Sequence, residues 1–168
     1  NSVDAEQVKA AGQLVLAAKK SDHARGFAGG VGGKNRVAAG VVDMAVVWNG
    51  DALRAMDEAD DLDLAYVLPR EGSVLWADVM AIPGNAPNVH GAHQFVNFIL
   101  AADVGARLSN HNRYATPNRA ALPGINAADR ANPVLYPSTE VMRRLQYQQD
   151  VGEHARLYDE VWTAVKAR

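Results

Sequence analysis

Apolar residues recur at helical spacing in five stretches of the chain. The first follows Asp4 and Gln7, whose spacing is that of an N-terminal capping box. Asn88, Asp103 and Ser138 stand where later stretches begin, and their side chains suit N-caps. The apolar face of the first stretch consists of Val8, Ala11, Leu14, Val15 and Ala18. The pattern predicts helices near residues 5–19, 89–101, 103–110, 138–146 and 151–166.

Three shorter segments have the composition of strands. Residues 42–48 form an apolar run that we expect to be a buried strand, followed by a tight turn at Asn49 and Gly50. Residues 64–68 predict a short strand, and residues 73–82 predict a longer one that ends before Pro83. Strands that alternate with amphipathic helices indicate an α/β fold.

The segment 73–82 carries the first candidate for chemistry. Side chains of a strand alternate between its faces, so Trp76 and Asp78 are expected on one side, with Val74 and Met80. An indole beside a carboxylate suits an organic cation, because the ring packs on methylene groups and the carboxylate binds the ammonium. The competing interpretation makes Trp76 a core residue and Asp78 the end of a ladder or a turn cap.

Asp51 has two interpretations as well. It stands where the helix after Trp48 is expected to begin, so it suits the N-cap of that helix. It is also a second carboxylate at the carboxyl end of a predicted strand, which is where open α/β sheets bind ligands. A second Trp-plus-Asp set strengthens the hypothesis of a cation site.

Composition limits the classes of function. The chain has 168 residues, 48% of them hydrophobic, which is enough for one ordinary core. Its formal charge of −2 gives no reason to expect nucleic acid or an anionic membrane as a partner. No apolar run is long enough to predict stable membrane insertion. The sequence contains no cysteine, which excludes a disulfide framework and a thiolate metal site.

The sequence gives little support for an enzyme or a metal site. A hydrolase needs a nucleophile with a base, and the sequence has neither a Gly-x-Ser-x-Gly motif nor a cysteine. His90 and His93 lie three residues apart on a predicted helix, but no further ligand is evident, so solvated histidines are expected. The acidic run 57–63 lacks the glycine and terminal glutamate of an EF-hand, and a solvated loop is expected. We therefore expect no enzyme, no metal and no cofactor.

A series of short motifs resembles the C-terminal half of the periplasmic spermidine/putrescine-binding proteins of ABC transporters. Each motif alone is weak, but all of them occur in the family's order and spacing, from about Asn1 to Arg168. The motifs are Val47–Gly50, Leu68–Gly72, Trp76–Asp78, Ala81–Pro83, Asn97–Leu100, Asp103–Val104, Tyr114–Asn118, Tyr136–Pro137 and Gln148–Gly152.

The resemblance implies half of a two-lobe periplasmic-binding-protein fold of type II. About residues 1–76 and 135–168 would belong to one lobe, and about 79–130 would contribute to the other. It also implies a truncated start at Asn1, because the family is about twice as long, so an N-terminal half of the same protein is expected as a partner. The other implied partners are a polyamine ligand and the permease subunits of an ABC importer, and the implied location is the periplasm.

The resemblance also implies the ligand-binding residues. Trp48 and Trp76 match the rings that stack on the methylene chain, and Asp78 matches the carboxylate that binds an amine. Asp51 matches an acid of putrescine-selective members, where spermidine-preferring members have a small residue. Tyr114 matches an aromatic residue of the interlobe cleft and Gln148 a polar one.

Two alternatives stay open at this point. A periplasmic binder of another small ligand shares the architecture, but the two Trp-plus-Asp sets favour a polyamine. A fragment that folds without binding any ligand is the second alternative. The sequence does not decide between putrescine and spermidine, nor the oligomeric state.

Overall fold

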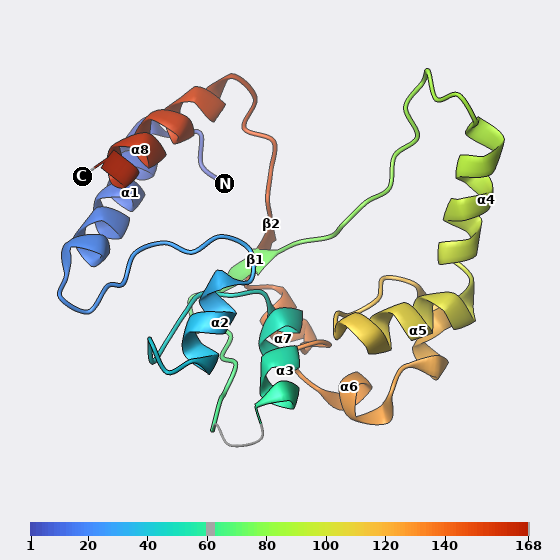
Figure 1. Cartoon of the computed structure of the whole chain (residues 1–168). Coiled ribbons are helices and arrows are strands. Elements are labelled where there is room, and N and C mark those ends of the chain that lie inside the picture. Colours follow the sequence, from blue (N-terminus) through green and yellow to red (C-terminus); the bar gives the residue numbers. More distant parts are fainter. Residues whose placement is uncertain (60–62, 168) are drawn as a thin grey trace. The chain divides into compact units, whose positions relative to one another are not determined.

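The computed structural model describes residues 1–59 and 63–167 and divides them into two compact units. Unit 1 joins the two ends of the chain: Asn1–Gly29 and the segment that begins at Tyr147. Unit 2 is the continuous stretch Gly30–Gln146 between them. Figure 1 labels the elements of both units. None of the described helices is both long and apolar enough to cross a bilayer.

Unit 1 is a pair of helices, α1 (Ala5–Lys20) and α8 (Ala155–Ala167), with the short 3-10 helix η2 (Gly152–His154) before α8. The two helices lie side by side in Figure 1. They approach closely at Gly12, where an added Cβ would overlap Cγ1 of Val161. Lys19 Nζ donates hydrogen bonds of 2.9 and 2.8 Å to the carbonyls of Val165 and Lys166, which satisfies free acceptors at the end of α8.

Unit 2 contains short helices and a minimal sheet. Its two strands, β1 and β2, pair with each other, and the last residue of β2 lies at the boundary with unit 1. The elements are α2 (Gly32–Ala38), α3 (Asn49–Glu58), β1 (Ser73–Leu75), α4 (Val89–Ile99), α5 (Ala102–Asn112), η1 (Arg119–Gly124), α6 (Ala127–Ala131), α7 (Thr139–Met142) and β2 (Leu145–Tyr147).

The core of unit 2 lies where α5 meets η1. Ala106 of α5 packs there with Ala121 and Ile125, all three buried, and Tyr136 covers them. Small side chains allow the two helices to approach, and a Cβ added at Gly105 of α5 would lie in ordinary contact range of the Cβ of Ala121. This packing holds α5 against η1, and the loop 113–118 follows the end of α5.

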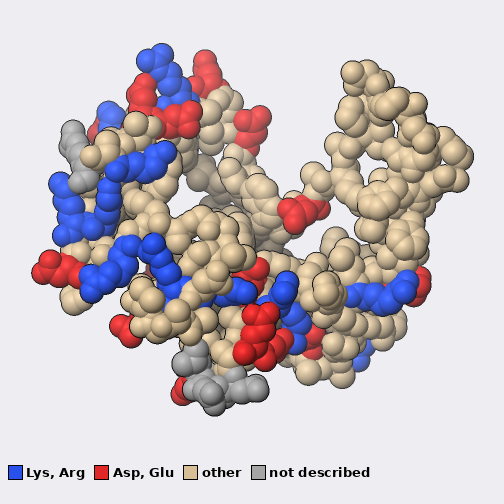
Figure 2. Space-filling view, viewed as in Figure 1, with Lys and Arg blue, Asp and Glu red and all other residues tan. Residues whose placement is uncertain are grey.

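The segment 79–102 contains no Asp, Glu, Lys or Arg. It includes α4, and Figure 2 shows an uncharged surface at this helix. Phe95 and Phe98 of α4 are 58% and 57% exposed, although the helix has a clear apolar face. The two rings of that face therefore stay largely exposed, while Val96 and Ile99 are half-buried.

The predicted strands are mostly absent from the described residues. Residues 42–48 and 64–68 are not strands, and β1 covers only the first three residues of the predicted strand 73–82. A strand requires a neighbour for its ladder, and among the described residues β1 and β2 pair only with each other. The segments keep strand-like composition without burial: Val46, Val67 and Val79 are 104%, 73% and 87% exposed.

The predicted helices are mostly confirmed. Those near 5–19, 89–101 and 103–110 appear as α1, α4 and α5, and the last appears as η2 followed by α8. The helix expected over 138–146 is only α7, because β2 begins at Leu145. Two details were wrong. Of the predicted apolar face of α1 only Val8 is buried, and Ala11, Leu14, Val15 and Ala18 are exposed. The N-cap of α5 is Ala101 rather than Asp103.

The capping residues Asp4, Asn88 and Ser138 are confirmed, since each side chain accepts a hydrogen bond from the first turn of its helix. In the acidic run, Asp57 and Glu58 belong to α3 rather than to a loop, and residues 60–62 lie outside the described residues. The division into two lobes, about 1–76 with 135–168 against 79–130, stays a prediction.

Candidate functional site

Two tryptophans of unit 2 lie side by side near the sheet. Trp48 precedes α3 and Trp76 follows β1, and their ring centroids are 6.3 Å apart with the planes tilted by 50°. Their residues are 48% and 52% exposed. The prediction that Trp48 ends a buried strand is therefore wrong, and the interpretation of Trp76 as a core residue is wrong too. Both indoles are available to a ligand.

Asp78 contacts one of these rings directly. The indole Nε1–H of Trp76 donates a hydrogen bond of 2.9 Å to Oδ1 of Asp78. Both residues lie beyond the end of β1 at Leu75, so the carboxylate does not end a ladder as the competing interpretation expected. The bond orients the carboxylate and leaves its second oxygen to accept from a ligand.

Asp51 lies in the first turn of α3, and Trp48 holds the N-cap position without a side-chain cap bond. The interpretation of Asp51 as the N-cap is therefore wrong, and so is the prediction of a turn at Asn49 and Gly50, because the helix begins three residues earlier than an N-cap at Asp51 requires. A carboxylate in the first turn still interacts favourably with the helix dipole, by about 0.3–1 kcal/mol.

Tyr114 lies beside Asp51. Burial raises the pKa of its hydroxyl above the ordinary 10.0, and the negative charge of Asp51 raises it further. A hydrogen bond with the Asp51 side chain and the charge of Asp78 act in the same direction, while a bond with the Asp51 backbone opposes them. The phenol therefore stays a neutral donor beside Asp51 at physiological pH.

Gly50 allows this approach. A Cβ added at position 50 would lie 2.6 Å from Cδ2 and from Cζ of Tyr114, so the ring packs where only glycine leaves space. Sequence reasoning treated this glycine as part of a turn and missed its role. No local pattern pointed to it, because the ring that covers Gly50 comes from a distant part of the chain.

The two carboxylates have no cationic partner within the described part of the chain. Neither Asp51 nor Asp78 forms an ion pair with a lysine, arginine or histidine there, although seven ion-pair contacts occur elsewhere. Unpaired carboxylates beside the faces of two indoles can bind an organic ammonium by charge-assisted hydrogen bonds and cation–π attraction. No cluster of metal-ligating side chains occurs among the residues that the structure describes.

Gln148 is the sixth predicted ligand residue, and it belongs to unit 1 rather than unit 2. Its part in the site stays a prediction. The structure thus brings together five of the six predicted residues: Trp48, Asp51, Trp76, Asp78 and Tyr114.

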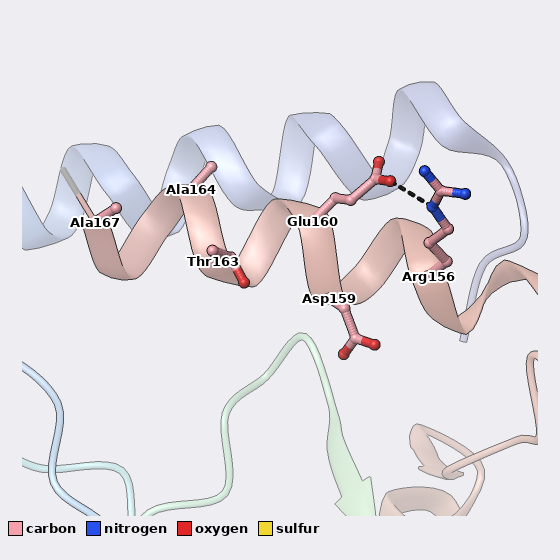
Figure 3. Close-up of a pocket in the computed structure, with 6 residues that line it drawn as sticks. All are labelled: Arg156, Asp159, Glu160, Thr163, Ala164 and Ala167. Atoms are coloured by element: carbon pink, nitrogen blue, oxygen red, sulfur yellow. Dashed lines mark hydrogen bonds and ion pairs between the residues drawn. The ribbon is translucent and has the colours of Figure 1, made fainter.

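A separate hollow lies on the surface of α8 in unit 1 (Figure 3). Figure 3 shows Arg156 and Glu160 joined along the helix by an ion pair of 2.8 Å. All residues that line the hollow come from this one helix, so it is a helix surface and not an enclosed site. They are Arg156, Asp159, Glu160, Thr163, Ala164 and Ala167.

Comparison with known proteins identifies the class. The family model of the bacterial extracellular solute-binding proteins matches residues 2–133. The spermidine/putrescine-binding periplasmic protein of Escherichia coli strain K12 is 34% identical over 128 residues, which cover 76% of this chain and 36% of that protein. A putrescine-binding periplasmic protein of the same organism is 34% identical over 138 residues, covering 79% of this chain and 37% of that protein.

A solved structure from Listeria monocytogenes, assigned to a spermidine/putrescine ABC transporter, has a TM-score of 0.87 to this chain at 29% identity. The match covers 99% of this chain and 50% of that one. The fold is therefore that of part of a periplasmic binding protein, and the relatives are transport proteins that bind solutes, not enzymes.

The chain belongs to the bacterial extracellular solute-binding proteins. It spans little more than a third of the length of the two Escherichia coli relatives.

Proposed function

We propose that the chain is part of the periplasmic solute-binding component of an ABC importer and that it binds a polyamine, putrescine or spermidine. The carrying observation is the group formed by Trp48, Trp76, Asp78 and Asp51 in unit 2. It offers two aromatic faces and two carboxylates that lack a cationic partner in the described part of the chain. A polyamine is an aliphatic chain with an ammonium group at each end, and it requires these two kinds of contact.

The relatives support this ligand class, because those from Escherichia coli are named for binding spermidine and putrescine. The chemistry of the site supports a polyamine independently of these relatives. Each cation–π contact contributes about 0.5–2 kcal/mol, and the larger values require a desolvated site. The same proposal names the permease subunits of an importer as partners. It also includes Gln148 as a further ligand-binding residue.

The expected affinity of the 168-residue chain is low. Trp48 and Trp76 are about half exposed, so an ammonium bound beside them stays in contact with water. Exposed charge pairs contribute only about 0–1 kcal/mol. We expect weak binding that strengthens when the rest of a full-length receptor is present, and submicromolar binding by this chain alone would contradict a site that is open to water.

Titration calorimetry with putrescine, spermidine, 1,4-butanediol and maltose tests the proposal. Putrescine and spermidine should bind, and added salt should lower the affinity of both because the contacts are exposed charge pairs. The diol has the carbon chain of putrescine without its charges, so it isolates the contribution of the carboxylates. Equal binding of the diol, preferential binding of maltose, or no binding of either polyamine would overturn the assignment.

A further inference from the structure

Arg113 is the only non-glycine residue with a positive φ among the described residues. It ends α5 as the C-cap, with φ 61° and ψ 28°, and its N–H donates to the carbonyl of Ser109. A side chain in this left-handed conformation is strained, and such strain persists only where the surrounding contacts hold it in place. Tyr114, the tyrosine of the candidate site, is the next residue.

The guanidinium of Arg113 links three elements of unit 2. Nη1 lies 2.8 Å from Oδ2 of Asp57 near the end of α3, and Nη2 lies 3.2 Å from Oδ1 of Asp129 in α6. Asp129 is only 4% exposed, so its charge requires this partner. Within the described part of the chain, Nε of Arg113 is buried without a hydrogen-bond partner. Arg113 is therefore energetically unfavourable in two respects: its backbone is strained, and one donor of its side chain has no acceptor.

Tyr114 is held on several sides by this arrangement. Its N–H donates to Oδ1 of Asn112 at 2.9 Å, and its carbonyl accepts from the hydroxyl of Ser109, which is buried in α5. Its ring covers Gly50 at the start of α3, and Arg113 pairs with Asp57 near the end of the same helix. Two successive residues after α5 thus contact the two ends of α3.

We propose that Arg113 is a positioning residue of the polyamine site. By tying the end of α5 to α3 and α6, it holds the Tyr114 ring on Gly50 and keeps the phenol beside Asp51. This inference rests on the proposed function for its consequence in binding. The placement of the ring is a separate claim that needs no ligand.

Arg113→Gly tests the side chain without disturbing the backbone, because glycine adopts a positive φ freely. In the variant, nuclear Overhauser contacts between the Tyr114 ring protons and the Gly50 α-protons should weaken or disappear. Putrescine should bind about threefold or more weakly. Arg107→Ala breaks an exposed ion pair with Asp103 on the same helix and should change neither measurement.

The double variant shows whether Arg113 acts through Tyr114. In a Tyr114→Ala background, Arg113→Gly should cause no further loss of putrescine affinity, because the group that it positions is gone. An equal loss in both backgrounds would overturn the positioning role. Arg113→Gly leaves Asp129 unpaired, and the variant could fail to fold for that reason. In that case Asp57→Asn is the test variant, because Asp57 is half exposed and removing its charge leaves no buried charge unpaired.

The two claims fail separately. If the unmodified chain shows no putrescine binding, the proposed function fails, and the contacts between Tyr114 and Gly50 still decide whether Arg113 positions the ring. If putrescine binds but the ring contacts and the affinity are unchanged in both Arg113→Gly and Asp57→Asn, the positioning role is wrong and the proposed function stands.

Discussion

At the scale of residues, the two carboxylates of the candidate site differ in their surroundings. Asp78 is exposed and receives a hydrogen bond from the Trp76 indole, whereas Asp51 is half-buried beside the Tyr114 phenol. Each neighbour is a neutral donor that orients its carboxylate without cancelling the charge. The two negative charges therefore stay available to a cationic ligand.

We expect Asp78→Asn to weaken putrescine binding about fivefold, since an exposed ammonium–carboxylate pair contributes about 1 kcal/mol. Asp51→Asn should weaken it by a similar factor if Asp51 binds the second charge of the ligand. It should change little if Asp51 only interacts with the helix dipole. Titrations of both variants decide this, with Asp159→Asn on α8 as a control that removes the same charge from unit 1.

Most residues of the site were predictable because their chemistry is local. Trp76 and Asp78 are two residues apart, and Trp48 and Asp51 are three apart, so each pair could be recognised in the sequence alone. The contact of Tyr114 with Gly50 was not predictable, because the two residues are far apart in sequence and the shape of one ring determines which residue fits. Arg113 was missed for a similar reason, since only the fold reveals its conformation and its two partners.

At the scale of elements, α3 depends on its contact with the loop after α5. Gly50→Ala should destabilise the chain by about 1–3 kcal/mol, because the added methyl group overlaps the Tyr114 ring. This outcome opposes helix propensity, which favours alanine over glycine. Gly84→Ala is the matched control, since no atom lies near its added Cβ, and it should stay within about 0.5 kcal/mol. Urea unfolding that ranks the two variants equally would contradict the packing.

The α4 helix provides a second prediction at this scale. Its phenyl rings Phe95 and Phe98 are exposed within a segment that contains no Asp, Glu, Lys or Arg. Exposed apolar surface of this kind favours association. The 168-residue chain should therefore self-associate as its concentration rises, and a Phe95→Asp, Phe98→Asp variant should stay monomeric in sedimentation velocity. A chain that is monomeric at high concentration without these changes would contradict the prediction.

Helices were more predictable than strands for a physical reason. The hydrogen bonds of a helix lie within one segment, so the periodic apolar face and the caps at Asp4, Asn88 and Ser138 located α1, α4 and α7. A strand depends on a neighbour that its own sequence does not specify. Residues 42–48 and 64–68 have suitable composition, yet they form no ladder within the described residues.

At the scale of the whole molecule, two partly buried phenols make stability depend on pH in the alkaline range. Burial raises the pKa of Tyr66 and Tyr114 above 10.0, and Asp51 adds to the shift of Tyr114. Above that pH the unfolded chain loses these protons before the folded chain does. The stabilisation is therefore complete below pH 10 and is lost as the pH rises through the folded-state pKa values.

Urea unfolding below and above a pH of about 10 checks this prediction. The free energy of unfolding should fall above that pH, and the fall should be smaller in Tyr114→Phe and Tyr66→Phe, which have no proton to lose. Tyr147→Phe is the control, because that side chain is exposed. A pH dependence that is the same in all four proteins would show that the two phenols are not responsible.

The tryptophans and carboxylates of unit 2 are the groups that we propose bind a polyamine. The chain contains three tryptophans, and their indole N–H signals in proton–nitrogen correlation spectra report each ring separately. Trp162 lies in unit 1, where it packs against Phe27, and serves as an internal reference. Putrescine should shift the Trp48 and Trp76 signals in a saturable way and leave Trp162 unchanged, and Asp78→Asn should weaken the response. Shifts of Trp162 alone, or no saturable shift of Trp48 and Trp76, would contradict the account.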